Sequence, residues 1–569
     1  MKLKSITFFL SLLAFPCFSQ TWLWAKTVTA GNANGYSITT DAEGYVYVTG
    51  SFNTPTLTLG SITLTNAGQN NIFIAKYDAC GNVIWAKSNG GINSDVSHSI
   101  CVDKGGNAFI TGAFSSPTIS FGSTEITSVD NLGNYNLFVA KYDRNGNPVW
   151  AKSAKSSGGI YGNEGNCVKA DAAGNVFVTG NFNSHTVAFD SFILTDMLVD
   201  DIFIVKYDAN GNVLWAKSAA GRGYDQGNAL GLDAGGNVFV GGTFSSASIT
   251  FGYANIHKIG ERDVFVAKYD ANGNFIWAQT AGGATFSYGN SLCTDADGNA
   301  YITGDFDSPT ITFGPIVLNN TTTDSIASDI FIAKYNTNGN VVWAKSAGGT
   351  GYDHSNCISA DAAGNLFLTG AFTSANIAFG STTLSHPVNS TLYPVFVVKC
   401  DVSGNVSCAS TILNGSINYE NNGTISADPY GNAYVLGNFQ ASPFVVGADT
   451  LNLTGTNNIF VAKYTCGGIV NTSNCNPAVE MFVPNAFSPN GDGQNDVLFI
   501  NANNNIQSLT FEIFNRWGNV VFKTTNVNIG WDGMYNGNKL DSDIFAYILK
   551  ATLTDGTTVN KKGNISLVK

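Results

Sequence analysis

The sequence predicts an all-β fold built from one repeated four-stranded unit. Three observations support this. Tryptophan recurs at steps of 61 to 66 residues, at Trp24, Trp85, Trp150, Trp215, Trp277 and Trp343. Apolar and polar residues alternate over short runs bounded by Asp, Asn and Gly, which is the pattern of strands joined by tight turns. No run has the 3.6-residue periodicity of an amphipathic helix. A fixed period of this size indicates a repeat architecture.

The unit that ends at Trp215 contains the four predicted strands in order. The first two are residues 165–170 and 176–180, the third is 202–207, and the fourth holds Trp215. An Asp-x-x-Gly-Asn turn joins the first strand to the second, and another joins the third to the fourth. In such turns Asp accepts bonds from its own backbone and Gly supplies a positive φ. Each unit is therefore predicted to be an antiparallel meander.

The number of strands predicts how the repeat closes. The first turn occurs seven times, at Asp41, Asp103, Asp171, Asp233, Asp295, Asp361 and Asp428. The last unit ends after its third strand, at Tyr464, whereas the N-terminus has a spare strand around Trp24. Pairing these two strands would close a ring and leave only short edges. We therefore predict a seven-bladed β-propeller over residues 20–465, closed by an N-terminal strand.

The repeated phrases also carry a family resemblance. Asp-x-x-Gly-Asn-x-Tyr-Val-Thr-Gly, Asp-Ile-Phe-Ile-Ala-Lys-Tyr-Asp and Gly-Asn-Val-x-Trp-Ala-Lys resemble the seven-bladed β-propeller repeat of secreted bacterial proteins, over roughly residues 21–470. Propellers of this kind include binding proteins, scaffolds and enzymes, so the resemblance implies the fold but does not select a function.

Residues 1–19 have the features of a secretory signal peptide. Lys2 and Lys4 precede an apolar run over residues 6–15, and small residues follow near Ser19. Lipidation at Cys17 is the weaker alternative, because Pro16 stands where a small residue is needed. No other apolar run approaches the roughly 20 residues of a membrane helix, so no transmembrane segment is predicted.

After a predicted linker over residues 466–477, a different domain follows at 478–569. Its motifs are Phe487-Ser-Pro-Asn-Gly-Asp-Gly-Gln-Asn-Asp, Ile513-Phe-Asn-Arg-Trp-Gly-Asn and Gly530-Trp-Asp-Gly. They closely resemble the gliding-motility-associated C-terminal domain, the type B sorting signal of the type IX secretion system in Bacteroidota. One departure is at residues 540–544, where that family usually has a Gly before its last Tyr-rich strand. The resemblance implies a small Ig-like β-sandwich, the secretion machinery as a partner, and an extracellular or cell-surface destination.

Composition limits the partners of the chain. The net charge is −12 and the pI is near 4.8, which argues against nucleic-acid binding because that function requires a basic face. Only 12% of the residues are charged, against about 25% in an average soluble protein. The surface is therefore predicted to be built mainly from Thr, Ser, Asn and Gly.

Nine of the ten cysteines remain after the signal peptide, an odd number that leaves at least one outside any intramolecular bridge. Cys400 and Cys408 replace the Tyr and Trp that the other units keep, which favours a disulfide between them. Cys466 and Cys475 are placed to close the linker with a second one. The cysteines on predicted first strands are interpreted as small buried hydrophobic residues, at Cys101, Cys167, Cys293 and Cys357.

One recurring pattern of polar residues is a candidate for a functional site. Eight residues before the first-turn Asp, six units carry a side-chain oxygen, at Asp95, Asn163, Asp225, Ser287, Asp353 and Glu420. Three residues further on come Tyr36, His98, Asn166, Asn228, Asn290, Asn356 and Gly423. One interpretation is that these side chains cap loop backbone. The other is a polar ring at the channel mouth that binds a cation or a hydroxyl-rich ligand.

The C-terminal domain contains a candidate calcium loop. Asn490, Asp492 and Asp496 place side-chain oxygens at alternating positions with Gly between them, although the downstream Glu of an EF-hand is absent. The alternative is an Asx-rich turn. Calcium is the one cofactor that the sequence suggests.

No motif predicts catalysis. The chain lacks Gly-x-Ser-x-Gly, His-Glu-x-x-His and a phosphate loop in a helical context, and its units are nearly uniform. We therefore predict a secreted or surface binding and adhesion protein with no catalytic residues, holding a glycan or protein on the face with the variable segments. A polysaccharide hydrolase or lyase is the alternative. That alternative requires one unit with an odd cluster of Glu, His, Arg or Tyr.

Overall fold

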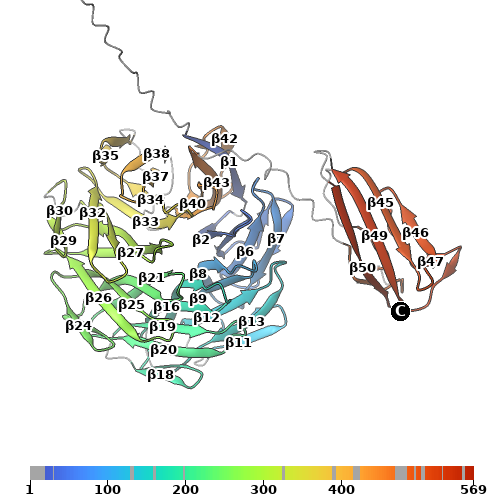
Figure 1. Cartoon of the computed structure of the whole chain (residues 1–569), viewed down its shortest axis with the longest axis horizontal. Coiled ribbons are helices and arrows are strands. Elements are labelled where there is room, and N and C mark those ends of the chain that lie inside the picture. The colour runs from blue at the N-terminus through green and yellow to red at the C-terminus, as the bar shows by residue number, and fades with distance from the viewer. Residues whose placement is uncertain are drawn as a thin grey trace, which may run out of the picture. The chain divides into compact units, whose positions relative to one another are not determined.

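A computed structural model of the chain describes residues 20–29, 31–128, 134–157, 162–195, 199–322, 327–386, 393–413, 423–467, 483–491, 495–500, 506–527, 529–553 and 558–568. Throughout these residues the regular elements are β-strands, with no α-helix (Figure 1). The chain divides into two compact units, 1–470 and 471–569, which are described separately.

The first unit contains seven antiparallel sheets that share one order of four strands, and the fourth of them is extended to six strands by a further hairpin. We number them sheets 1 to 7, each written from its inner to its outer strand. They are β2(Ala33–Thr40)-β3(Val46–Phe52)-β6(Asn71–Tyr77)-β7(Val83–Asn89); β8(Asp95–Val102)-β9(Ala108–Phe114)-β12(Asn136–Tyr142)-β13(Pro148–Ser153); β15(Asn163–Ala170)-β16(Val176–Phe182)-β19(Asp201–Tyr207)-β20(Val213–Ala219); β21(Asp225–Leu232)-β22(Val238–Phe244)-β25(Asp263–Tyr269)-β26(Phe275–Gly282); β27(Ser287–Thr294)-β28(Ala300–Phe306)-β31(Asp329–Tyr335)-β32(Val341–Ala347); β33(Asp353–Ala360)-β34(Leu366–Phe372)-β37(Val395–Cys400)-β38(Val406–Ile412); and β39(Thr424–Ala427)-β40(Asn432–Phe439)-β43(Asn458–Cys466)-β1(Gln20–Val28).

The inner strands of the seven sheets follow one another around a common centre (Figure 1). Each inner strand contacts the next, in the order β2, β8, β15, β21, β27, β33 and β39, and β39 contacts β2 again. The N-terminal strand β1 completes sheet 7 by pairing antiparallel with β43, from Gln20 opposite Cys466 to Val28 opposite Ile459. This pairing of the first and last strands of the repeat is the one that the strand count predicts.

Each segment between a second and a third strand contains a further hairpin, which the sequence analysis treated only as a variable segment. The hairpins are β4(Thr56–Leu59)-β5(Ile62–Thr65), β10(Thr118–Phe121)-β11(Thr124–Thr127), β17(Thr186–Phe189)-β18(Phe192–Thr195), β23(Ser248–Phe251)-β24(Ala254–His257), β29(Thr310–Phe313)-β30(Ile316–Asn319), β35(Asn376–Phe379)-β36(Thr382–Ser385) and β41(Phe444–Val446)-β42(Asp449–Leu451). In sheet 1, β4 contacts β1 of sheet 7 and β5 contacts β7. The hairpin therefore fills the gap between two outer strands, with Leu57 and Leu59 buried. In sheet 3, the short strand β14(Lys155–Ser157) also joins β17.

The repeated tryptophans join neighbouring sheets. Trp150 donates its indole N–H to the carbonyl of Ala209, 3.1 Å away in the third-to-fourth-strand turn of the next sheet. Gly211 of that turn packs closely against the indole ring. A Cβ added at this position would stand 3.0 Å from Trp150 Cδ2. The same pair of contacts recurs for all six tryptophans, from Trp24, Trp85, Trp150, Trp215, Trp277 and Trp343 to Ala79, Arg144, Ala209, Ala271, Thr337 and Val402.

The seventh joint is a disulfide between Cys408 on β38 and Cys466 on β43. This corrects both predicted bridges: Cys400 is a buried free thiol, and Cys475 lies outside the described residues. The reason is the direction of the side chains. Cys400 packs in the core between sheets 5 and 6, whereas Cys408 packs in the core between sheets 6 and 7. The two thiols therefore leave opposite faces of sheet 6.

The second unit has one five-stranded sheet in the order β44(Ala486–Phe487), β50(Thr558–Leu567), β49(Asp543–Leu553), β45(Ile506–Phe514) and β46(Val520–Thr524). A separate hairpin, β47(Met534–Tyr535)-β48(Asn538–Lys539), is the other sheet among its described residues. Trp531, Phe511 and Phe545 are buried in a core of their own. The unit therefore has the independent core expected of a separate domain.

Candidate functional site

The oxygen-bearing side chains of the predicted ring accept hydrogen bonds from the loops of the first unit. Asp95 Oδ2 accepts bonds from the Gly91 amide at 2.7 Å and from the Ser116 hydroxyl at 2.8 Å. Asp225 accepts the Ser246 hydroxyl at 2.6 Å in the corresponding place of sheet 4. These aspartates are fully buried, so they are not open to a ligand.

Two further members of that ring also bond a serine hydroxyl, and one member lies outside the described residues. Asp353 accepts the Ser374 hydroxyl at 2.7 Å, and Asn163 Oδ1 accepts the Ser184 hydroxyl at 3.0 Å. Ser287 is fully buried, and Glu420 lies outside the described residues. Asp95, Asp225, Asp353 and Asn163 thus fit the capping interpretation, because each bonds the connection within its own sheet, whereas the buried Ser287 Oγ has no hydrogen-bond partner among the described residues. The sequence could not separate the two interpretations, since the same oxygen atoms serve either use.

Burial sets the ionisation of these aspartates. It raises the pKa of Asp95 and Asp225 above the ordinary value, against the lowering effect of their amide and hydroxyl donors. For Asp353, burial and then the neighbouring charge of Asp329 raise the pKa to about 7, although the Ser374 bonds act in the opposite direction. An acid that is this deeply buried resists ionisation because its charge loses hydration.

The residues three positions further along lie on the inner strands. In six sheets the inner strand has a bulge, and the bulged residue is Tyr36, His98, Asn166, Asn228, Asn290 or Asn356. Asn228 Nδ2 donates to the carbonyl of Gly289 at 3.0 Å, and Asn290 Nδ2 donates to the carbonyl of Ser355 at 3.0 Å. The bulged residues Asn228 and Asn290 thus link their own inner strands to the next one.

Sheets 5 and 6 break this uniformity with an acid, a histidine and an amide in contact. His354 Nδ1 lies 2.7 Å from Asp305 Oδ1, and Asn290 Nδ2 donates to the same oxygen at 2.8 Å. The Asp305 side chain is 5% exposed and that of His354 is 16% exposed. Asp305 is the penultimate residue of β28 in sheet 5, whereas His354 is the second residue of β33 in sheet 6. The contact therefore exists only because the two sheets are neighbours.

Aromatic side chains and a cation surround this pair. The Tyr288 ring stacks on Phe286 with centroids 6.4 Å apart, and the Arg262 guanidinium lies 5.4 Å from the centroid of Tyr288. Tyr352 is 42% exposed and interacts electrostatically with Tyr288 and Asp305. Burial raises the pKa of Tyr288, so its hydroxyl keeps its proton. We call Arg262, Phe286, Tyr288, Asp305, Tyr352 and His354 the mouth cluster.

Among the described residues, no other pair of sheets repeats the mouth cluster. The position of Tyr288 is held in sheets 1 to 4 by Asn34, Val96, Glu164 and Gln226, and the position of Asp305 by Ser51, Ala113, Asn181 and Thr243. A comparison of equivalent positions across the repeated units would therefore have revealed this difference from the sequence. Sequence reasoning missed it because it judged the units as nearly uniform.

The predicted calcium loop is placed only in part. Asp496 Oδ1 accepts the Gly491 amide at 2.6 Å, and Asp492 lies outside the described residues. Among the side chains that the structure places, no group of three or more His, Cys, Asp or Glu residues is arranged to hold a metal ion. Nor does that part of the chain contain a helix with the length and hydropathy needed to cross a membrane.

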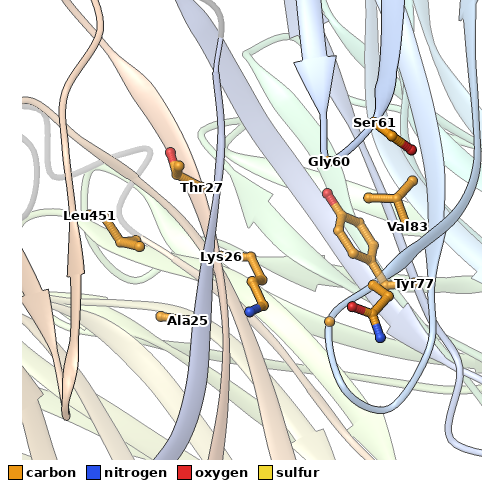
Figure 2. A pocket seen from close by; sticks show the side chains of 10 residues that line it. Ala25, Lys26, Thr27, Gly60, Ser61, Tyr77, Val83 and Leu451 are labelled. Atoms are coloured by element: carbon orange, nitrogen blue, oxygen red, sulfur yellow. The ribbon is translucent and has the colours of Figure 1, made fainter. Parts of the chain in front are cut away.

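A pocket of about 470 Å³ lies where β1 faces sheet 1 (Figure 2). Figure 2 shows Lys26 and Thr27 on β1, with Tyr77 and Val83 on the facing elements. Lys26 is the one charged residue in its lining, which contains no acid, histidine or cysteine. The pocket is therefore a cavity whose lining lacks the convergent charged and aromatic groups of the mouth cluster.

Comparison with known proteins identifies the C-terminal segment. Residues 481–567 match the CHU_C Type IX secretion signal domain. This signal implies export to the cell surface or the extracellular space. The match covers the larger part of the second unit and none of the sheets of the first.

Three further similarities extend over most of the chain. An uncharacterized WD repeat-containing protein of Acanthamoeba polyphaga mimivirus is 24% identical over 517 residues, which cover 74% of this chain and 36% of that protein. The extracellular domain of a putative hybrid two-component system of B. thetaiotaomicron aligns over 98% of this chain and all of its own, at 10% identity and a TM-score of 0.18. A Synechocystis apocarotenoid oxygenase mutant aligns over 81% of this chain and 89% of its own, at 9% identity and a TM-score of 0.29.

Proposed function

We propose that the chain is a binding and adhesion protein that type IX secretion delivers to the cell surface or beyond. In this proposal residues 20–465 are a seven-bladed β-propeller that presents the ligand site, and residues 478–569 are the sorting domain. The observation that carries the binding role is the mouth cluster, a single asymmetric site on an otherwise regular ring. The secretion signal match supports the destination.

The chemistry of the mouth cluster favours a saccharide ligand. The rings of Tyr288 and Tyr352 offer flat apolar faces with hydroxyl groups at their edges, which suits a ligand with both C–H faces and hydroxyls. Asp305, His354 and Arg262 supply an acceptor and donors within the same small area. A few convergent polar groups beside aromatic surface are typical of a small-molecule site.

A polysaccharide hydrolase is the second candidate, because Asp305 and Asp307 both act electrostatically on Tyr288 and Tyr352. Glycoside hydrolysis uses two carboxyl groups on either side of the scissile bond. Asp307 Oδ1, however, accepts bonds from the Thr285 hydroxyl at 2.6 Å and the Phe286 amide at 2.8 Å. Both carboxylates are thus held by protein donors, which favours binding over turnover.

The test is a glycan array followed by calorimetry with the mature full chain. Tyr288→Ala and His354→Ala should each weaken binding at least tenfold, which is about 1.4 kcal/mol. Gln226→Ala is the matched control, because Gln226 occupies the position of Tyr288 in sheet 4. Equal binding by the wild type and both mouth-cluster variants would contradict the proposal. Release of reducing ends that Asp305→Asn abolishes would favour the hydrolase instead.

A further inference from the structure

Three successive sheets place an aromatic residue at one equivalent position. The residue directly before the inner strand is Tyr224 in sheet 4, Phe286 in sheet 5 and Tyr352 in sheet 6. Its carbonyl accepts the amide of the residue that follows the second strand of the same sheet, from Ser245 at 3.0 Å, Asp307 at 3.2 Å and Thr373 at 2.7 Å. The same bond identifies the equivalent residues of sheets 1 to 3, which are Asn32, Ser94 and Gly162. Among the positions that the structure describes, the aromatic residues are therefore confined to sheets 4 to 6.

These positions are connected from one sheet to the next. Arg262, directly before the third strand of sheet 4, forms a parallel β-bridge with Phe286 of sheet 5. Ser328 of sheet 5 bridges Tyr352 of sheet 6 in the same way. Because β21, β27 and β33 follow one another around the centre, the three aromatic residues form an arc at one face of the ring (Figure 1). The strands β22 and β25 separate Tyr224 from Phe286, a distance on the order of 10 Å.

The arc is open to solvent at both ends. Tyr224 is 50% exposed and Tyr352 is 42% exposed, whereas Phe286 is half-buried and stacks on Tyr288. The fold does not require a ring at this position, because Gly162 makes the same backbone bond in sheet 3 without any side chain. Single exposed aromatic residues are ordinary, but three at one repeated position form a surface that a ligand can cover.

The charges beside the arc select the class of saccharide. Arg222 and Arg262 supply positive charge, and Glu261 and Asp307 supply negative charge, all on side chains that are at least partly exposed. Asp305 of the mouth cluster adds a further acid. An acidic polysaccharide would therefore meet more carboxylates than guanidinium groups, on a chain whose net charge is −12. A neutral glycan avoids this repulsion.

We propose that the ligand of the mouth cluster is a neutral polysaccharide whose chain lies across sheets 4 to 6, on the arc of Tyr224, Phe286 and Tyr352. The inference rests on the proposed saccharide-binding function and extends the site to Tyr224, outside the mouth cluster. Sugar C–H faces pack on the aromatic rings, while polar groups at the ring edges bond to hydroxyls. Because Tyr224 is a strand-to-strand journey away from Phe286, only a chain of several sugars contacts both.

The test is calorimetry of the full mature chain with cellohexaose, xylohexaose, chitohexaose and mannohexaose, each compared with its own disaccharide. At least one hexasaccharide should bind, with a Kd about tenfold or more below that of its disaccharide. Tyr224→Ala should weaken binding of the hexasaccharide about fivefold or more and leave that of the disaccharide unchanged. Tyr224→Phe keeps the ring and should keep the preference for the longer chain.

Tyr253→Ala is the matched control, because Tyr253 is 83% exposed but lies in the turn of the outer hairpin β23-β24. Equal affinity for a hexasaccharide and its disaccharide would overturn the inference, as would a folded Tyr224→Ala variant that binds the hexasaccharide like the wild type. If Tyr288→Ala still weakens binding in either case, the mouth cluster remains a site for a short saccharide. Binding of none of the four hexasaccharides would overturn the inference and the saccharide proposal together.

Discussion

At the scale of single residues, each repeated tryptophan makes two contacts that explain its spacing. The indole N–H of Trp85 donates to the carbonyl of Arg144, and the indole face lies against Gly146 of the same turn. The turn motif and the Trp motif are therefore two halves of one joint between successive sheets. A glycine is required here for two separate reasons, a positive φ and the closeness of the ring.

Substitution of Gly146 separates these two reasons. Gly146→Ala should destabilise the protein by about 2–5 kcal/mol, because φ is +81° and the new Cβ would stand 2.6 Å from Trp85 Cδ2. Gly380→Ala is the matched control: its φ is +61°, but nothing lies within 4 Å of the new Cβ. That variant should lose only about 1–2 kcal/mol. Urea unfolding measures both, and equal losses would contradict the packing half of the argument.

Asp353 should make stability depend on pH. Its folded pKa of about 7 exceeds the ordinary value, so the folded state holds the proton more tightly than the unfolded state does. The contribution is therefore fully present at low pH and is lost as pH rises from about 4 to 7, at up to about 1.4 kcal/mol per unit.

Asp353→Asn should flatten this slope when unfolding free energies are measured from pH 4 to 8. An amide suits the position, because sheet 3 carries Asn163 there. An unchanged slope in Asp353→Asn would show that other groups cause the pH dependence.

At the scale of elements, the sequence pattern was enough to place the strands and the pairing of β1 with β43. It was not enough for contacts between sheets. Cys408 pairs with Cys466 because both face the same inter-sheet gap, and nothing in the local spacing specifies that gap. Asp305 and His354 are 49 positions apart and meet for the same reason. The outer hairpins were missed because their strands have only three or four residues.

The disulfide should matter most among the cysteines. Cys408→Ser with Cys466→Ser should cost about 4 kcal/mol of unfolding free energy, from the loop of 58 residues that the bridge closes. Cys80→Ser changes a half-buried cysteine outside the disulfide and is the control, with a change expected within about 0.5 kcal/mol. Guanidinium unfolding should show the same loss when the wild type is reduced. Equal stability of the oxidised and reduced wild type would contradict this prediction.

At the scale of the whole molecule, the two units have separate cores, and the function that we propose assigns them separate tasks. The secretion signal lies within residues 481–567, and the mouth cluster lies in the first unit. Deleting residues 481–567 should therefore stop export while leaving ligand binding intact. Cell fractionation of the native host should then find the truncated chain in the periplasm. Normal appearance of that chain outside the cell would contradict the assignment.

The pairing of β1 with β43 also has a consequence for how the chain folds. Thr27 bonds to Ile459 across 432 residues of sequence, so β1 cannot pair until β43, the last strand of the first unit, has been synthesised. Contacts between residues this distant in sequence form slowly, because the entropy of closing a long loop is lost before the contacts contribute any stabilising free energy. Until then β1 and β43 are unpaired edges open to other chains. The bridge between Cys408 and Cys466 then links the late strand to its neighbour, which makes the completed ring slow to open again.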